Sequence, residues 1–171
     1  NILQLRELAL KEVAFRVEKK VENEIVSIDK GVRHEKFLAC ISSNEKTPRH
    51  IIRKAARLAS RYNTVFSALY VQTPVESTER INLASQRHLL NHFKLVTELG
   101  GEVLQVASAN VLDEIIKTCQ EKQITTICMG QPAFKMPSTL FSISKYKKFL
   151  ASLAQMNIDL IIPVSYTHLT L

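Results

Sequence analysis

The chain lacks several features that would place it outside the ordinary globular class. Its 171 residues include only 4 glycines and 5 prolines and no tryptophan, which excludes collagen-like and low-complexity architectures. No apolar run approaches the roughly 18 residues needed to cross a bilayer. No basic-then-apolar leader opens the sequence, so nothing in it predicts secretion. With 46% hydrophobic and 23% charged residues, the composition favours a soluble domain with a substantial core.

Cysteine is also scarce. The three cysteines, Cys40, Cys119 and Cys128, form no C-x-x-C pair and are odd in number. Two lie in predicted strands and one lies in a predicted helix. This pattern favours buried, reduced thiols in a cytoplasmic protein over a metal site.

The formal net charge of +7 raises the question of a nucleic-acid partner. Lysine and arginine are spread over several predicted helices and are not interleaved with exposed aromatics or glycines, as they are in single-strand binders. No nucleic-acid partner is therefore expected, and a solvated basic surface is favoured. The alternative that Arg53, Arg57 or Lys46 faces an anionic ligand or acidic lipid headgroups stays open.

The first 35 residues differ from the rest. Leu3, Leu10 and Val17 recur every seven positions, which predicts one helix with an apolar stripe from Asn1 to about Glu24. Residues 25–35 form a connector. We interpret residues 1–35 as a linker that joins the chain to something upstream.

From Lys36 onward, apolar segments alternate with amphipathic ones. Strands are expected at residues 37–41, 65–71, 102–107, 124–130 and 158–164, with a long helix after Thr73-Pro74 that ends at Leu99 before Gly100-Gly101. The pattern predicts an α/β domain over residues 36–164, with an open, Rossmann-like, five-stranded parallel sheet flanked by helices. Residues 165–171 continue no pattern, resemble translated sequencing adapter, and are interpreted as a non-native tail.

Several short segments, in order, resemble one family. They are Asn1 to Leu10 with Ala14 and Arg16-Val17, Cys40-Ile41, Arg53 with Ala55 to Ala59, Tyr70-Val71 with Thr73-Pro74, Leu99-Gly100-Gly101 and Gly130-Gln131-Pro132. Together they resemble the KdpD family of sensor histidine kinases, which control potassium uptake. The resemblance covers nearly the whole chain except the tail. The matching region is the universal-stress-protein-like domain with its preceding linker helix.

The resemblance implies a cytoplasmic regulatory domain of a bacterial inner- or plasma-membrane protein. Kinase activity would belong to the parent protein and not to these residues, in which we find no nucleophile, base and orienting group. The implied partners are the ATP-binding, membrane and kinase domains of the parent, with a homodimer as a further possibility. His88 and His92 share a predicted helix face at metal-ligand spacing, but we expect them to be exposed histidines.

Universal stress proteins that bind ATP have an acidic residue after the first strand and a glycine-rich signature after the fourth. This chain has Ser42-Ser43-Asn44 at the first position. At the second, Gly130 is followed by Gln131 and a proline, which removes a backbone donor. ATP is therefore a less favoured ligand.

Many KdpD proteins of Gram-positive bacteria instead bind cyclic di-AMP through S-x-S, about twenty residues, and F-T-A-x-Y. Phe66, Ser67, Ala68 and Tyr70 match the second half, with serine in place of threonine. Asn44 stands where the second serine of the first half is expected. Hydroxyls and an amide can donate to phosphate or adenine, and an aromatic ring can stack on a purine.

The resemblance implies a cyclic dinucleotide ligand. The predicted site comprises Ser42, Ser43, Asn44, Phe66, Ser67, Ala68, Tyr70 and Gly130. The alternative for Phe66, Ala68 and Tyr70 is a strand face packed in the core. The alternative for Ser42, Ser43 and Asn44 is a simple turn that leads into a helix. Gly130 is expected to allow a close backbone approach whether or not a ligand binds. The alternative functions are an interaction module that binds no nucleotide and an ATP-binding universal stress protein.

Overall fold

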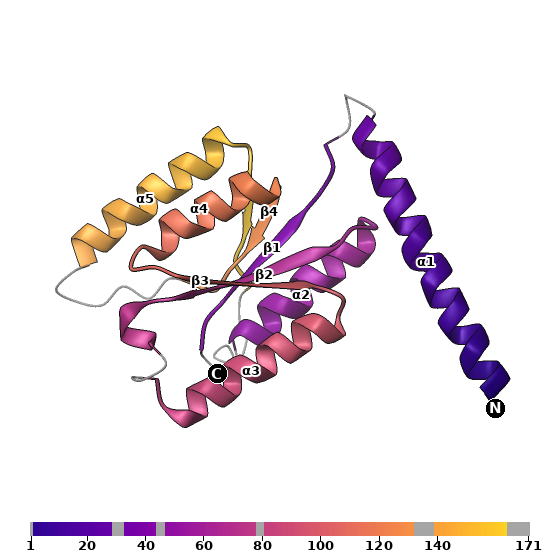
Figure 1. The fold of residues 1–171 in the computed structure, drawn as a ribbon. Helices are drawn as coiled ribbons and strands as arrows, with labels where there is room; N and C mark the ends of the chain where they lie inside the picture. The colour runs from indigo at the N-terminus through magenta and orange to yellow at the C-terminus, as the bar shows by residue number, and fades with distance from the viewer. Residues whose placement is uncertain (1, 29–32, 44–46, 78–80, 132–138, 164–171) are drawn as a thin grey trace, which may run out of the picture.

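The computed structural model describes residues 2–28, 33–43, 47–77, 81–131 and 139–163, with no account of the side chains at 15, 17–28 and 139–142. One mixed α/β body follows a long first helix (Figure 1). The strands are β1 Phe37–Ile41, β2 Phe66–Gln72, β3 Glu102–Ala107, β4 Thr126–Cys128 and β5 Asp159–Ile161. They form one sheet in the order β3-β2-β1-β4-β5, and every pairing is parallel. The predicted fold class is confirmed.

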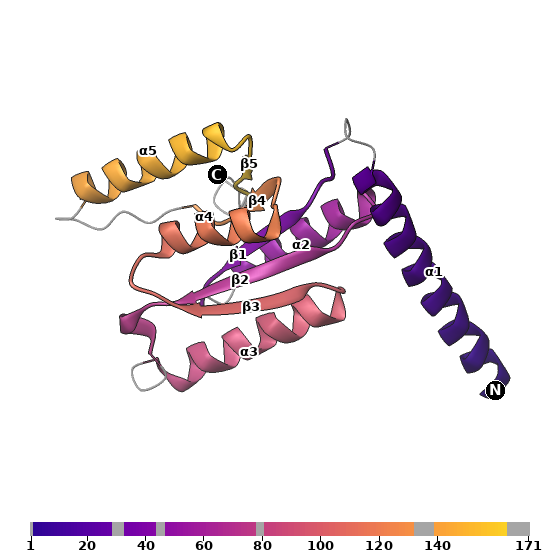
Figure 2. The ribbon, with the colours of Figure 1, turned by 45° about the horizontal axis from the view of Figure 1, so that its top comes forward.

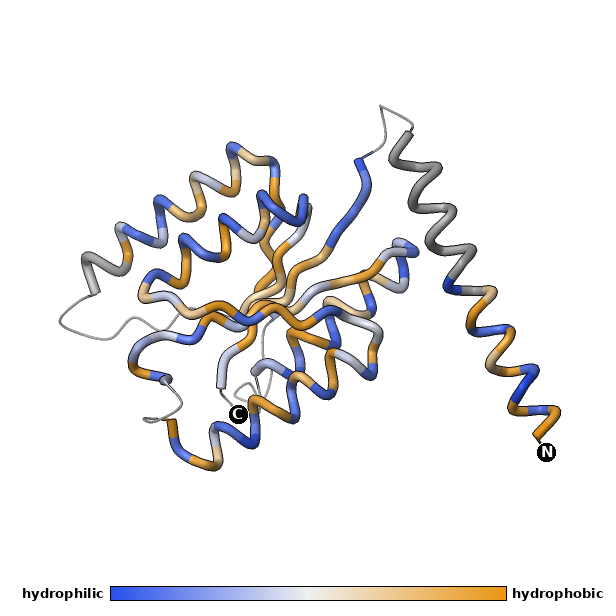
Figure 3. The backbone as a smooth tube through the Cα atoms, viewed as in Figure 1, coloured by the Kyte–Doolittle hydropathy of each residue, from blue (hydrophilic) through white to orange (hydrophobic). Residues whose placement is uncertain are grey.

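Helices cover both faces of this sheet, as Figures 1 and 2 show. On one face lie α2 (Thr47–Arg61) and α3 (Leu83–Glu98), and on the other lie α4 (Val111–Lys122) and α5 (Thr139–Gln155). Phe37, Ala39 and Ile41 join the core beneath α2 and α3, whereas Leu38 and Cys40 join the core beneath α4 and α5. A strand buried on both faces needs apolar side chains at every position. This explains the continuous apolar run of β1, which Figure 3 shows near the centre of the molecule.

The strand register determines which residues meet at the carboxyl edge of the sheet. Ile41, the last residue of β1, pairs with Tyr70 of β2. On the other side of β1, Ala39 pairs with Cys128, the last residue of β4. The chain therefore winds outward from β1 in both directions. In open α/β sheets, ligands bind outside the carboxyl ends of the strands at such a switch point.

The segment after β2 differs from the predicted long helix. Thr73 and Pro74 lead into a single 3₁₀ turn, η1 (Pro74–Glu76), and not into α3. The helix α3 begins later, at Leu83, where the Asn82 side chain accepts a hydrogen bond from the Ser85 amide at 2.7 Å. The helix predicted after Thr73-Pro74 is therefore present, but it begins only after Asn82, whose side chain provides the N-cap.

The prediction that both helix-α3 histidines are exposed is also wrong for one of them. His92 is only 2% exposed, on the face of α3 that contains the buried Val96. His88 is partly buried. Among the described residues, no group of three histidines, cysteines or acidic residues could hold a metal ion.

The first helix, α1 (Ile2–Ile28), extends beyond the predicted end at Glu24. Figures 1 and 2 both show it standing apart from the sheet and its helices. Its apolar side chains at Leu3, Leu10 and Val13 are exposed. None of the helices among the described residues has the length and apolar character required to span a membrane.

The residues just before β1 are attached to the amino edge of the sheet. Arg33 donates through Nη2 to the Thr125 carbonyl at 2.8 Å and also to the Asn157 carbonyl. Thr125 in turn donates through Oγ1 to Glu35 at 2.6 Å. These bonds connect the residues before β1 with the segments that precede β4 and β5.

Two glycines follow α3, and each position requires glycine for a different reason. Gly100 has φ +83° in the left-handed region, whereas a Cβ on Gly101 would lie 2.6 Å from Phe66 Cζ and 2.9 Å from Val96 Cγ1. We therefore predict that Gly101→Ala lowers the free energy of unfolding by about 1–3 kcal/mol through overpacking. Urea denaturation of the wild type and the variant would measure this difference in the free energy of unfolding.

Shortening the opposing side chain tests that cause. Phe66→Leu should cost less in the Gly101→Ala background than in the wild type, and should show no such coupling with Gly100→Ala. Strictly additive effects of Gly101→Ala and Phe66→Leu would contradict the packing explanation.

Candidate functional site

Two of the predicted site residues meet on a carboxylate that the sequence analysis did not select. Ser43, two residues after β1, donates through Oγ to Glu76 Oε1 at 2.8 Å. The Tyr70 hydroxyl, near the end of β2, donates to Glu76 Oε2 at 3.4 Å. We call these three residues the Ser43–Glu76–Tyr70 cluster. It places two hydroxyls from neighbouring strands on one anionic group at the carboxyl edge.

The position of the Tyr70 hydroxyl follows from the burial of its ring. The residue is 1% exposed and lies in the core under α2 and α3. Its ring meets Phe93 of α3 edge-on, with ring centroids 6.0 Å apart. Since the ring is enclosed, only the hydroxyl can contact a ligand. The stacking role considered for an aromatic residue at this site does not fit Tyr70.

Glu76 reaches the cluster because η1 folds the chain back directly after β2. The Glu76 amide donates to the Thr73 carbonyl at 2.9 Å, and Gln72 Nε2 donates to the Glu76 carbonyl at 3.3 Å. The sequence offered one signal for this residue. An acidic side chain follows Pro74 by two positions and stands six residues after Tyr70, but the S-x-S and F-T-A-x-Y pattern contains no acidic residue.

The environment of the cluster keeps the Tyr70 hydroxyl protonated. Burial, followed by the negative charge of Glu76 and the hydrogen bond to it, raises the pKa of Tyr70 from 10.0 to about 12. A tyrosine is already a neutral hydrogen-bond donor at neutral pH, and the raised pKa extends this state to more alkaline pH. A neutral hydroxyl can donate one proton, either to Glu76 or to a ligand oxygen.

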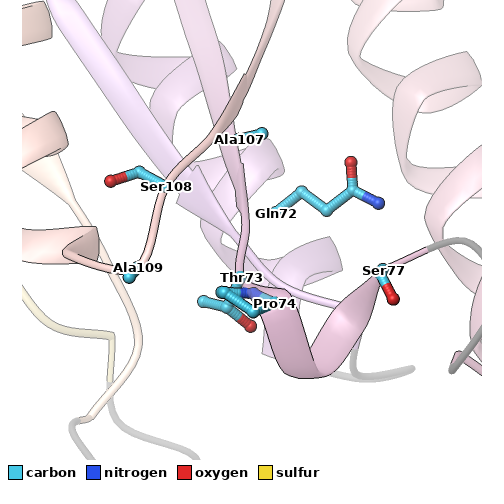
Figure 4. A pocket seen from close by; sticks show the side chains of 7 residues that line it. All are labelled: Gln72, Thr73, Pro74, Ser77, Ala107, Ser108 and Ala109. Atoms are coloured by element: carbon cyan, nitrogen blue, oxygen red, sulfur yellow. The ribbon is translucent and has the colours of Figure 1, made fainter.

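Two cavities flank η1. A small one of about 130 Å³ borders the cluster and is lined in part by Ser42, Tyr70 and Glu76, with apolar side chains from β1, β2 and α4. A larger, open one of about 620 Å³ lies between the carboxyl ends of β2 and β3 (Figure 4). Thr73 lines both cavities. The 3₁₀ turn and the residue before it therefore separate two neighbouring spaces.

The polar lining of the larger cavity comes from two segments. In the view of Figure 4, Ser108 lies on one side and Gln72 and Ser77 lie on the other, with Thr73 between them. The Ser108 amide donates to the Gln72 carbonyl at 3.0 Å, which holds the two strand ends together. Ligand cavities typically have volumes of roughly 300–1,000 Å³, so this one is of ligand size.

The structure places the other strand residues of the predicted site elsewhere. Phe66 is 2% exposed at the amino end of β2, where its ring lies against Gly101. Ser67 donates to Glu102 at 3.3 Å, at the start of β3. Ala68 is fully buried in the core. These three residues do not reach the carboxyl edge, and Asn44 lies outside the described residues.

Gly130 has a packing reason to be glycine. It follows β4, and a Cβ at this position would lie 2.9 Å from Thr47 Cγ2 in the first turn of α2. The close approach brings the start of α2 against the carboxyl edge of the sheet. The close backbone approach predicted at Gly130 is therefore explained by packing against α2.

The thiols and the basic side chains lie outside the cluster. Burial raises the pKa of Cys40, which borders the small cavity, and raises that of Cys119 to about 12 and that of Cys128 to about 11. All three thiols are free and stay protonated at neutral pH, so none is an activated nucleophile. Arg53 and Arg57 are exposed along α2.

Comparison with proteins of known sequence shows similarity to sensor proteins. The chain is 37% identical over 136 residues to the sensor protein KdpD of Clostridium acetobutylicum, and 32% identical over 136 residues to that of Escherichia coli. These matches cover 77% and 78% of the chain. The matched region spans only 14% and 15% of the two relatives. No family model matches the chain.

Comparison with solved structures shows the same fold in universal stress proteins. One is a universal stress protein in complex with cAMP, with a TM-score of 0.54, 11% identity, and coverage of 78% of this chain and 98% of that one. Another is the universal stress protein from Archaeoglobus fulgidus in complex with dAMP, with a TM-score of 0.51, 11% identity, and coverage of 77% and 98%. At such identities the similarity defines the fold alone.

The raised pKa of Tyr70 predicts a loss of stability at high pH. The folded pKa of about 12 exceeds the unfolded value of 10.0, so the folded state retains the proton that the unfolded state has lost. Stability should therefore fall as the pH rises from about 10 to about 12. Comparing wild type with Tyr70→Phe by urea denaturation at pH 9 and pH 11 measures this contribution. An equal fall in both proteins would show that other groups cause it.

Proposed function

We propose that this chain, a universal-stress-protein-like domain of the KdpD family, is a regulatory domain that binds cyclic di-AMP and controls a sensor histidine kinase for potassium uptake. The observation that supports it best is the meeting of Ser43 and Tyr70 at the carboxyl edge of neighbouring strands. Similarity to KdpD sensor proteins supports a sensor histidine kinase as the parent protein. Two universal stress proteins of this fold are in complex with adenine nucleotides.

The proposed ligand fits the chemistry of this edge. The hydroxyls of Ser42, Ser43 and Tyr70 can donate to the phosphate oxygens. The cavity of about 620 Å³ beside η1 offers room for the larger part of a dinucleotide, and its lining includes the polar side chains of Gln72 and Ser108. In this arrangement Phe66, Ser67 and Ala68 support the strand and do not contact the ligand. Gly130 contributes by holding α2 at the edge.

Regulation requires that the ligand favour one state of the domain over another. A ligand shifts an equilibrium only by its differential affinity for the two states. We infer that these states differ in how the domain is arranged relative to α1, which joins it to the rest of the parent chain. Kinase activity, the membrane spans and the ATP-binding domain would belong to that parent, whose other domains are the proposed partners.

A second candidate function is an interaction module that binds no nucleotide. The exposed apolar side chains of α1, including Leu3, Leu10 and Val13, favour it, because such a stripe can pack on another domain or on a second copy of the chain. An ATP-binding universal stress protein is less favoured, because Gln131 follows Gly130 and the chain has only 4 glycines in all.

Calorimetry with cyclic di-AMP and with ATP tests the proposed ligand. We expect cyclic di-AMP to bind and ATP to bind more weakly. Ser43→Ala and Tyr70→Phe should each weaken cyclic di-AMP binding by about 2- to 10-fold, the usual effect of losing one hydrogen bond. Ser60→Ala, an exposed change at the far end of α2, is the matched control and should leave the affinity unchanged.

Three outcomes would contradict the proposal in different ways. The absence of heat with either nucleotide would favour the interaction module. Preference for ATP would favour an ordinary universal stress protein. Binding of cyclic di-AMP that is unaffected by both Ser43→Ala and Tyr70→Phe would place the ligand elsewhere on the domain.

A further inference from the structure

The Ser43–Glu76–Tyr70 cluster already contains an anion. Glu76 accepts hydrogen bonds from Ser43 at 2.8 Å and from Tyr70 at 3.4 Å. These are the hydroxyls that the proposed ligand would need for its phosphate. A serine or tyrosine hydroxyl has one proton to donate. The hydroxyl protons used by Glu76 are therefore not available to a phosphate oxygen at the same time.

The charges add to this conflict. An ionised carboxylate and a phosphate that share the same donors lie within a few ångströms of each other, and like charges at such distances repel. Tyr70 cannot relieve the repulsion by moving, because its ring is enclosed in the core against Phe93. The group free to move is Glu76.

Glu76 lies on a segment that is weakly held. The turn η1 has only three residues, Pro74 is exposed and Val75 is 74% exposed. Its links to the end of β2 include the Glu76 amide bond to the Thr73 carbonyl and the Gln72 side-chain bond to the Glu76 carbonyl. Segments with few buried contacts open at low free-energy cost. The carboxylate of Glu76 is thus a substantial part of what holds η1 on the site.

We propose that Glu76 is an internal competitor for the anionic ligand. In the nucleotide-free domain its carboxylate occupies Ser43 and Tyr70, and η1 separates the small cavity from the larger one. A phosphate-bearing ligand displaces Glu76, and η1 moves away, which connects the two spaces. Glu76 therefore sets the affinity of the site and couples ligand binding to a change in backbone position. This inference rests on the proposed function for the identity of the ligand.

The conservative variant Glu76→Gln tests the competition. It keeps the size of the side chain but removes the charge, so cyclic di-AMP should bind about 3- to 10-fold more tightly than to the wild type. Glu121→Gln makes the same chemical change on an exposed side chain of α4, in the turn whose Lys122 contacts Glu102 at the amino edge. It should leave the affinity unchanged. Equal or weaker binding by Glu76→Gln would overturn the inference and indicate that Glu76 contacts the ligand.

A measurement without ligand separates this inference from the proposed function. Amide hydrogen exchange across residues 72–77 should be faster in Glu76→Ala than in the wild type, while exchange in β1 and β4 stays the same. Unchanged exchange across η1 would overturn the inference whatever binds. If neither the wild type nor Glu76→Gln binds cyclic di-AMP, the proposed ligand fails. In that case faster exchange would still show that Glu76 holds η1 on the two hydroxyls.

Discussion

The parallel pairing of β1 with β2 is the constraint on which the candidate site depends. Ile41, the last residue of β1, is level with Tyr70 near the end of β2, so the residues that follow β1 lie beside the Tyr70 side chain at the carboxyl edge. The register is rigid because both strands are buried on both faces, and a slip of one residue would exchange the faces of every side chain. The meeting of Ser43, Tyr70 and η1 follows from this rigidity.

Burial also determines what the site can offer. The ring of Tyr70 belongs to the core and its hydroxyl belongs to the edge, so the residue is structural at one end and available for binding at the other. A polar atom in such a place needs a partner. Glu76 meets that need through its bonds to Tyr70 and Ser43. In the proposed mechanism, stability without ligand and affinity for the ligand oppose each other at this one side chain.

The comparisons place this chemistry in a wider context. The chain is similar in sequence to KdpD sensor proteins and has the fold of the universal stress proteins, so the predicted resemblance is confirmed. A fold by itself does not define a ligand, because function resides in the site built on it. Here the edge of the sheet provides hydroxyls and a carboxylate, and the segment after β4 begins Gly130-Gln131-Pro132 instead of a glycine-rich run. The proposal of a ligand other than ATP rests on both features.

The sequence by itself determined the number of strands, their parallel arrangement and the end of α3, because apolar runs, amphipathic periods and Gly100-Gly101 are local signals. It also brought Ser43 and Tyr70 to the same edge, since consecutive parallel strands end together. Only the tertiary structure decided that Phe66 and Ala68 are enclosed in the core, that η1 precedes α3, and that Glu76 joins the two hydroxyls. A sequence motif along one strand does not show which of its side chains are buried in the core and which reach the open end of the strand. The partner of a hydroxyl depends on the path of a turn, which short-range sequence signals define poorly.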